Sequence, residues 1–396
     1  MNILLLTTIY PEPESYGIEN DTKVVHYFAR EWVKMGHRVV VFHLHTNAIK
    51  NVYRMLDGRY HGVRINKNEG VDVFCATSQL IVPHSFVPFK WQQEFVANKI
   101  VKSLFNEMPD FVPDVISVHF PMSLLYFFSK VRKSFPEVPS CAVMHGSDIR
   151  ELQKRGRDLS RLSESYDRFL FRSPKLKDRA VKMGINENKS HLALSGIDAS
   201  LLLTQEELEK KMSRTILDEW RLVYVGKLNV QKCVDTIIDA VNIIKGEYNV
   251  HLDLVGDGPD AELLKKKVKD LSLEKNVKFW GHQSREFSVK LMKESDVFVM
   301  VSRNETFGLV YVEAMSQGCI AIGSKGEGID GFIVDGENGF LVEPANANAL
   351  ADKLRFIFVL SPEKRKRIID NSYCKATMLT DAKAAQQYLE IIKEER

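Results

Sequence analysis

Two glutamates eight residues apart give the clearest chemical signal in this sequence. Glu305 and Glu313 bound the segment ETFGLVYVE, which follows an apolar run at 297–301. Eight residues are slightly more than two helical turns, so both carboxylates face one side if Glu305 stands at the helix entrance. Carboxylates there can accept hydrogen bonds from sugar or ribose hydroxyls. Acids that merely compensate a helix dipole would follow the same pattern, so that alternative stays open.

The start of the same helix and two lysines predict an anion site. The backbone N–H groups of Phe307, Gly308 and Leu309 would point at an anion, because a helix N-terminus carries partial positive charge. Lys227 directly follows an apolar strand pattern, and Lys232 stands just before a periodic helical segment. Cations in these positions can hold a diphosphate. Two ordinary surface lysines are the alternative.

A histidine also ends an apolar run in the first half of the chain. His145 follows Ala142-Val143-Met144 and precedes a glycine, and Asp148 lies three residues further on. A histidine at a strand end is typical of a site residue, although a hydrogen-bonded histidine at the edge of the core has the same pattern. We interpret His145 as a site residue. His119 ends a similar run at 115–118.

Two glycine-rich loops fit the dinucleotide-binding pattern only in part. GDGPDA at 256–261 fits G-x-G-x-x-A, but about twenty residues on, where an acid would hold a ribose, the chain reads WGH at 280–282. GEGIDG at 326–331 is not followed by a helix pattern. Both observations argue against a nicotinamide cofactor. The loop at Gly256 still offers N–H groups at a strand end, which suits phosphate or hydroxyl binding.

Apolar runs alternate with helical patterns in both halves of the chain. Short buried runs separated by helices favour a parallel sheet covered on both faces. We therefore predict an α/β fold of two doubly wound, Rossmann-like domains that face each other across a cleft. The expected strands are at 2–8, 38–44, 71–76, 115–119, 141–145, 191–195, 221–226, 250–256, 277–281, 297–301, 319–323 and 339–342.

A chain of 396 residues is too long for one ordinary core, which favours two domains. We place the N-terminal, acceptor-side domain at 1–198 and the C-terminal, donor domain at 199–378. The segment 201–219 reads as a charged helix that opens the second domain. Residues 379–396 are expected to form a C-terminal helix that packs back on the N-terminal domain.

Composition predicts a cytoplasmic globular protein. Apolar residues make up 44% of the chain and charged residues 27%, as in soluble domains. No apolar run approaches the length of a membrane span. The five scattered cysteines form no Cys-x-x-Cys pair, and we interpret them as reduced core thiols. The chain has no Asp-x-Asp and no His/Cys cluster, so we expect no metal or other cofactor.

Taken together, these residues resemble the retaining GT-B glycosyltransferases of family four, the "group 1" glycosyltransferases. The resemblance runs from the N-terminus to about Pro344. It is carried by the Glu305 and Glu313 spacing combined with the lysine pair, and by these further segments: Tyr10-Pro11 through Gly17, KMGH at 34–37, HGSD at 145–148, GID at 196–198, VGDGP at 255–259, Gly281 and DGENG at 335–339.

The resemblance implies a role for each matching residue. Lys227 and Lys232 would hold the donor diphosphate and stabilise it as it leaves. Glu305 would contact hydroxyls of the donor sugar, and Glu313 those of the ribose. Gly17 would let the backbone approach the phosphate.

The same resemblance places His145 beside the donor sugar, with Asp148 close by, and His119 near the acceptor. Base contacts in such folds are largely made by backbone, here near His282. The reaction would retain anomeric configuration, with the diphosphate taking the acceptor proton.

The sequence departs from the family pattern at four places. Lys227 stands where arginine is frequent, which keeps the charge but loses the guanidinium fork. Tyr16-Gly17 replaces paired glycines, and Ser195 replaces an asparagine. GEGID at 326–330 replaces Gly-Gly-x-x-Glu, which leaves the contacts to the sugar, and so the choice of donor, open.

Basic and aromatic residues in the first half predict contact with an anionic membrane. Residues 1–198 hold 27 Lys and Arg against 21 Asp and Glu, a balance of +6. The segment 150–179 holds ten basic and five acidic residues, with Arg150, Lys154, Arg155, Arg157 and Arg161 at its start, and FVPFKW at 86–91 leads into a segment with Lys99 and Lys102. Rings and ammonium groups together suit a headgroup layer. A solvated helix face and ordinary core packing of the rings are the alternatives.

The expected partners are a nucleotide-sugar donor and a glycan or lipid-linked acceptor at the inner membrane face, with no nucleic acid. Two other functions fit part of the pattern. One is a nucleotide-sugar epimerase of the same architecture, and the other is a binding protein that has lost turnover. The residues do not select the donor base, the sugar, the acceptor, the linkage or the oligomeric state.

Overall fold

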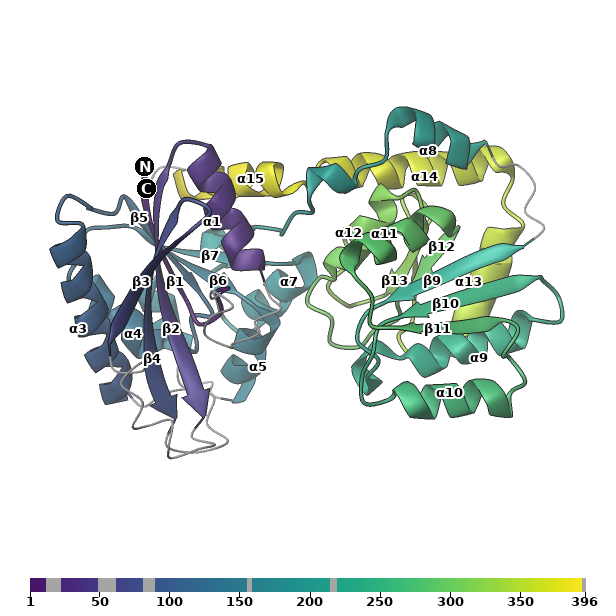
Figure 1. The fold of residues 1–396 in the computed structure, drawn as a ribbon, viewed down its shortest axis with the longest axis horizontal. Helices are drawn as coiled ribbons and strands as arrows, with labels where there is room; N and C mark the ends of the chain where they lie inside the picture. Colours follow the sequence, from purple (N-terminus) through teal and green to yellow (C-terminus); the bar gives the residue numbers. More distant parts are fainter. Residues whose placement is uncertain (12–22, 49–61, 81–89, 155–158, 214–218, 394–396) are drawn as a thin grey trace. The chain divides into compact units, whose positions relative to one another are not determined.

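The structure is a computed structural model that describes residues 1–11, 23–48, 62–80, 90–154, 159–213 and 219–393. It divides into two compact units, each with its own sheet (Figure 1). Unit 1 consists of Met1–Arg172, Leu176–Leu194 and Asp381–Arg396, and unit 2 of Ser173–Lys175 and Ser195–Thr380.

Unit 1 is built on an eight-stranded sheet with the order β3-β4-β2-β1-β5-β6-β7-β8. Every pair of neighbours is parallel except β3 and β4, which are antiparallel. The strands are β1 (Asn2–Thr7), β2 (Arg38–Ala48), β3 (Val63–Asn68), β4 (Val71–Leu80), β5 (Val115–His119), β6 (Ser140–Met144), β7 (Arg168–Phe171) and β8 (Ser190–Leu192). All five residues of β5 and of β6 are buried, as expected of central parallel strands.

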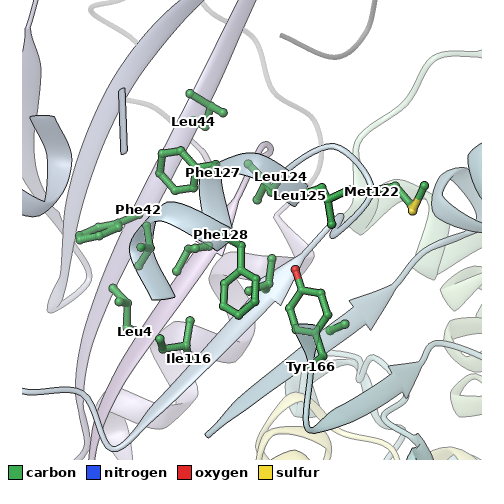
Figure 2. Packing of buried hydrophobic residues seen from close by; sticks show 14 of the residues in the cluster. Leu4, Phe42, Leu44, Ile116, Met122, Leu124, Leu125, Phe127, Phe128 and Tyr166 are labelled. Carbon is green, nitrogen blue, oxygen red and sulfur yellow. The ribbon is translucent and has the colours of Figure 1, made fainter. Parts of the chain in front are cut away.

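Apolar side chains fill the space between this sheet and its helices. Figure 2 shows Leu4, Phe42 and Ile116 from the strands facing Phe127 and Phe128 from α4 (Leu125–Arg132). α3 (Lys90–Glu107) packs beside α4 and contributes the buried residues of its inner face to the same cluster. The other helices of this part of the chain are α1 (Val24–Lys34), α5 (Gly146–Lys154), α6 (Leu159–Ser165) and α7 (Pro174–Lys182).

The last helix of the chain belongs to unit 1. α15 (Asp381–Lys393) lies against α1, and the indole Nε1 of Trp32 donates to the carbonyl oxygen of Ala385 at 3.0 Å. Tyr388 is fully buried, with its hydroxyl 2.5 Å from Oγ of Ser117 on β5. Its ring packs edge-on against Phe28 and Trp32. The C-terminal helix is therefore part of the unit 1 core.

Unit 2 has a six-stranded, wholly parallel sheet with the order β11-β10-β9-β12-β13-β14. Its strands are β9 (Trp220–Val225), β10 (Val250–Val255), β11 (Val277–Gly281), β12 (Val297–Val299), β13 (Ile320–Ser324) and β14 (Phe340–Val342). The strand order reverses at β9, which lies between β10 and β12. The carboxyl ends of such strands are where open α/β sheets bind ligands.

Helices cover this sheet. They are α8 (Gln205–Met212), α9 (Val234–Ile244), α10 (Ala261–Asp270), α11 (Arg285–Glu294), α12 (Leu309–Ser316), α13 (Ala347–Phe358) and α14 (Pro362–Thr377). α9 shows why the sequence folds in this way: its apolar positions recur at helical spacing, and they pack against α13.

The structure corrects three expectations. The edge strand β3 is antiparallel, whereas the sequence predicted parallel pairing throughout, and both β3 and β7 lie outside the expected strands. In the described part of the predicted helix at 201–219, the α-helix is α8, which begins only at Gln205, after a capping box formed by Thr204 and Glu207. Cys374 is exposed, so it is not a core thiol.

Within the described ranges, no helix is long and apolar enough to span a bilayer. The same residues contain no group of three or more His, Cys, Asp or Glu side chains that could hold a metal ion.

Candidate functional site

Two loops at the carboxyl edge of the unit 2 sheet pack together through glycine. The N–H group of Leu228, after β9, donates to the carbonyl oxygen of Asp257, after β10, at 2.9 Å. A Cβ atom on Gly256 would lie 1.9 Å from the carbonyl oxygen of Gly226, and Gly256 has a φ of +133°. Only glycine fits this close approach of two backbones. The two strand ends therefore form one compact platform.

Both predicted lysines extend from this platform. Lys227 is exposed, and its ammonium group has no partner among the residues that the structure describes. Lys232 ends the short turn Val230–Lys232, where the side chain of Asn229 accepts the N–H group of Lys232 at 3.2 Å. Its Nζ donates to the carboxylate of Glu305. One lysine is thus unpaired and the other is held by an acid.

Glu305 is held in place by the loop that follows β13. Its backbone N–H group donates to the carboxylate of Glu327 at 3.0 Å. A Cβ atom on Gly328 would lie 2.0 Å from the carbonyl oxygen of Thr306, so the two loops touch. Asn304, just before the glutamate, has a φ of +58°, a strained value that persists only where its surroundings enforce it.

The helix α12 starts with unpaired backbone donors. Gly308 caps it with a φ of +80°, and α12 begins at Leu309. Among the described residues, the N–H groups of Phe307, Gly308 and Leu309 have no hydrogen-bond acceptor. The hydroxyl of Tyr311 donates to the carbonyl oxygen of Met300 and so ties the first turn of the helix to the sheet. This arrangement is suited to an anion.

Glu313 lies further along α12 and binds a different cation. Nη2 of Arg285 is 2.6 Å from Oε1 of Glu313, whose side chain is 15% exposed. Arg285 begins α11, after the N-cap Ser284. His282 is exposed in the short connection between β11 and α11. The second carboxylate is therefore beside the loop where the sequence places the donor base.

The structure thus gathers most of the predicted donor residues at one edge of one sheet. They lie in the loops after β9, β10, β11 and β12 and in the helix α12 that follows the last of these loops, and these residues are Lys227, Lys232, Gly256, His282, Glu305, Phe307, Gly308, Leu309 and Glu313. Arg285 and Glu327 were not predicted from the sequence. Charged residues after a strand are common, and the contacts of these two with Glu313 and Glu305 depend on the order of the strands in the sheet. The roles predicted for the donor residues stay predictions.

In unit 1, the two predicted histidines meet at neighbouring strand ends. Nε2 of His145 lies 3.3 Å from Nδ1 of His119. The ring of Phe120 stacks on His145 with centroids 3.9 Å apart, and Phe120 has a φ of +61°. Burial lowers the pKa of both imidazoles well below the usual range, and the guanidinium of Arg172 lowers it further. His145 is partly exposed, whereas His119 is fully buried.

Asp148 fixes the loop that carries His145. Its carboxylate accepts the backbone N–H group of His145 at 2.8 Å and that of Met122 at 3.1 Å. The side chain is buried. Burial raises the pKa of Asp148 to about 7, although these two hydrogen bonds oppose the shift. Asp148 therefore positions the backbone of the loop, and its charge changes near neutral pH.

Some predicted residues lie outside the described part of the chain. Gly17 is one, and so are 86–89 of the aromatic segment, Arg155 and Arg157. Arg172 was counted in the basic stretch that the sequence offered as a surface feature. It is instead 3% exposed, which corrects that expectation.

Known proteins resemble the chain in sequence and in fold. It is 34% identical over 132 residues to N-acetyl-alpha-D-glucosaminyl L-malate synthase of Bacillus anthracis, covering 33% of this chain and 34% of that one. It is 32% identical over 151 residues to the lipopolysaccharide core biosynthesis glycosyltransferase LpsE of Rhizobium meliloti, covering 38% and 42%. These alignments therefore span less than half of either relative.

A solved structure covers the whole chain. The crystal structure of Alr3699/HepE of Anabaena in complex with UDP matches all of both chains with a TM-score of 0.70 and 18% identity. This likeness shows a shared GT-B fold.

Two family models together account for most of the chain. The model for glycosyltransferase family 4 matches residues 22–201. The model for glycosyl transferases group 1 matches residues 205–375. The first covers most of unit 1, and the second contains every donor-side residue described above. The chain therefore belongs to the group 1 glycosyltransferases.

Proposed function

We propose that the protein transfers a sugar from a nucleotide-diphospho-sugar to an acceptor, and that unit 2 holds the donor. The observation that carries this proposal is the anion site at the start of α12. Three N–H groups without an acceptor in the described part of the chain, at Phe307, Gly308 and Leu309, stand next to the loop in which Glu305 pairs with Lys232. Backbone donors and an ammonium group together bind phosphate oxygens well, because both offer positive charge to them.

The ion pair between Lys232 and Glu305 supports the assignment of both residues. In the ligand-free chain, Glu305 holds the ammonium group in place without hiding it, since the lysine side chain is 24% exposed. A diphosphate would bind Lys232 and the exposed Lys227, and a sugar hydroxyl would then use the freed carboxylate. Glu313 and Arg285 would bind the ribose and its surroundings. Two cations would stabilise the leaving diphosphate where other enzymes use a metal.

A donor panel tests this function. UDP-glucose is the first candidate, because a structure of the Anabaena protein contains it. Binding is measured as the rise in melting temperature, since a ligand that binds only the folded state stabilises it. Transfer is then measured as release of the nucleoside diphosphate with a panel of glycan and lipid-linked acceptors. The anomeric proton coupling of the product reports retention, which we propose. No binding by any nucleotide-sugar would refute the function.

The competing functions find no support. Both matching family models describe glycosyltransferases, which is evidence against a nucleotide-sugar epimerase. The intact lysines and glutamates argue against a chain that only binds its ligand. One outcome would favour the epimerase: the protein releases nucleotide without any acceptor, and the free sugar is inverted in configuration at one carbon.

We further propose that the acceptor is met at an anionic membrane surface. The exposed face of α3 carries three large rings, at Trp91 (62% exposed), Phe95 (55%) and Phe105 (45%). The Nζ atom of Lys99 lies 4.5 Å from the centre of the Phe95 ring, and Lys102 is exposed on the same helix. Rings of this kind enter the headgroup layer, and ammonium groups bind anionic lipids.

Vesicle flotation tests the membrane proposal. We expect the protein to float with vesicles rich in phosphatidylglycerol at low salt, and to lose this binding when Trp91 and Phe95 are both changed to Ser. Leu263→Ser is the matched control, because Leu263 is 69% exposed but lies on α10 of unit 2. A wild-type protein that stays in the soluble fraction would disprove membrane binding and leave a soluble acceptor.

A further inference from the structure

A buried arginine in the same core as the histidine pair has no carboxylate partner among the residues that the structure describes. Arg172 directly follows β7 and is 3% exposed. Its Nη1 donates to the carbonyl oxygen of Ala193 at 2.7 Å, while Nε and Nη2 have no hydrogen-bond partner among the described residues. The guanidinium carbon lies 4.5 Å from the centre of the Phe28 ring and 5.8 Å from that of Tyr388. Aromatic faces compensate its charge only in part.

This arrangement is costly, so it calls for an explanation. A charged group that is buried without a counter-ion loses its hydration, and unpaired N–H groups add to the cost. Burial lowers the pKa of Arg172 to about 10, which still leaves it charged at neutral pH. A leucine or methionine would fill the same volume without this cost. The positive charge itself is therefore the feature to explain.

The charge of Arg172 acts on the neighbouring pair of His119 and His145. His119 is the last residue of β5, and His145 directly follows β6, the strand next to β7. The ring of Tyr388 lies near both groups, with its centre 6.4 Å from that of His119 and 5.8 Å from the guanidinium carbon of Arg172. Arg172 lowers the pKa of both imidazoles. The other titratable groups around the pair are Tyr388 on α15 and Asp148 on α5. Burial raises the pKa of Tyr388 well above the usual range, so it is neutral, and Asp148 gains a proton near pH 7. Arg172 is thus the persistent charge among these groups.

We propose that Arg172 is a positioning residue that keeps the hydrogen-bonded pair of His119 and His145 uncharged. A proton added to either ring would place a second cation next to the guanidinium, in a region where burial already disfavours charge. The pair therefore retains its single N–H···N hydrogen bond, and the ring of His145 stays stacked on Phe120.

The unpaired nitrogen of His119 indicates which ring donates. Among the described residues, Nε2 of His119 is buried without a hydrogen-bond partner. A buried lone pair without a donor costs less than a buried N–H group without an acceptor. His119 then carries its hydrogen on Nδ1 and donates to Nε2 of His145, so His145 carries its own hydrogen on Nδ1. If the proposed function holds, the ring of His145 enters the reaction as a neutral N–H donor rather than as a charged acid.

Nitrogen NMR of ¹⁵N-histidine-labelled full-length protein tests this assignment without any substrate. In the wild type, we expect both imidazoles to keep the chemical shifts of neutral rings from pH 8 down to about 5.5. Arg172→Met removes the charge and should raise the titration midpoint of His145 by about one pH unit or more. Arg172→Lys keeps the charge and should leave the midpoint low.

Arg168→Met is the matched control. Arg168 begins the same strand and its Nη1 donates to the carbonyl oxygen of Ile392, so its loss perturbs β7 and α15 without removing the charge next to the pair. Titration of His145 near its ordinary value in the wild type would overturn the proposal. So would equal midpoints in the Met and wild-type proteins. If Arg172→Met does not fold, Arg172→Gln, which also removes the charge, is titrated in its place.

Activity gives a second readout that a merely structural role would not move. We expect kcat/KM of Arg172→Met to fall on the acid side at a higher pH than that of the wild type, while Arg172→Lys follows the wild-type profile. The NMR result does not depend on turnover. A protein without transferase activity would therefore refute the proposed function and leave the assignment of Arg172 to the NMR titration.

Discussion

The carboxyl edges of the two sheets differ in how their charged side chains are paired and buried. In unit 2, Lys232 pairs with Glu305 and Arg285 with Glu313, both pairs are partly exposed, and Lys227 is exposed. In unit 1, the corresponding edge buries His119, Asp148 and Arg172, and Arg172 has no acid partner among the described residues. Paired charges near the surface can exchange partners with a charged ligand. Buried groups without counter-ions instead fix each other's protonation state.

This difference indicates that ligand binding depends on unit 2 and that the protonation of the histidine pair depends on unit 1. The unit 2 edge combines a backbone platform with ammonium groups and N–H donors, the chemistry that a diphosphate requires. The unit 1 edge combines two imidazoles of lowered pKa with a buried cation. We therefore expect substitutions in unit 2 to change affinity and turnover at every pH. Substitutions in unit 1 should change the dependence on pH.

The largest expected effect is at the lysines. Lys232→Ala should lower kcat/KM about tenfold to a hundredfold, because it removes a charged hydrogen bond to the diphosphate worth about 1.5–3 kcal/mol. Lys227→Ala should act in the same direction. Steady-state kinetics with a saturating acceptor measure both. Lys293→Ala is the control, since Lys293 is also ion-paired, with Glu207, but away from the strand ends. Wild-type kcat/KM in both site variants would break the assignment.

Glycine substitution tests the backbone platform of unit 2. Gly256→Ala should lower the free energy of unfolding by about 1–3 kcal/mol and weaken donor binding, because the new Cβ would collide with the carbonyl oxygen of Gly226. Gly246→Ala is the matched control, since its Cβ would meet nothing within 4 Å. Chemical denaturation and donor titration measure the two effects. Equal stability of the two variants would show that the loops are not in close contact.

Acid should destabilise unit 1 more than unit 2. The pKa of His119 and of His145 is lowered in the folded state, so below pH 6.5 the unfolded chain binds protons that the folded chain does not. Stability from these groups is lost as pH falls. The raised pKa of Asp148 acts in the opposite sense, since folding then favours its proton between about pH 4 and 7. Because two imidazoles act in one sense and one carboxyl in the other, the unfolded chain binds about one net proton more than the folded chain on acidification.

Unit 2 shows the reverse sign. Asp253 raises the pKa of His251 through a hydrogen bond at 3.3 Å, so that group contributes stability below pH 6.5 that is lost as pH rises. Hydrogen exchange at pH 7 and 5.5, corrected for intrinsic rates, compares the units. Acidification should lower the opening free energy of β5 and β6 relative to β9 and β10 by about 1 kcal/mol. A larger loss in unit 2 would contradict the comparison.

The smallest expected effect is that of metal removal. If two lysines and backbone donors hold the diphosphate, transfer should persist in EDTA at an unchanged rate. Complete loss of activity, with recovery on addition of Mg²⁺ or Mn²⁺, would show that the cations of unit 2 are not sufficient.

Much of the fold followed from local patterns. β5 and β11 match their predicted bounds. β5 is a short, wholly buried run between clear breaks, and β11 is a short run with one lysine, Lys278, that ends at Gly281. β3 was missed because four of the six residues of VRINKN are polar and the strand lies at the sheet edge, where one side faces solvent. The antiparallel pairing of β3 with β4 comes from a tight connection that the apolar pattern does not report.

The sequence alone could place site residues relative to one another only where they lie in one continuous segment. The spacing of Glu305 and Glu313 could be read directly, and both lie around α12. Arg285 could not be assigned, because its contact with Glu313 depends on how α11 and α12 pack. Arg172 was misread as a surface charge, because its burial requires α1 and α15, which come from opposite ends of the chain.

Calorimetric titration with UDP measures directly whether the edge of the unit 2 sheet holds a nucleoside diphosphate. GDP and ADP are run in parallel, so that the result does not depend on one base. We predict saturable binding of at least one of them by the wild type without metal, weakened about tenfold or more in Lys232→Met and unchanged in Lys293→Met. Equal affinity of the wild type and Lys232→Met for the bound nucleotide would contradict the account.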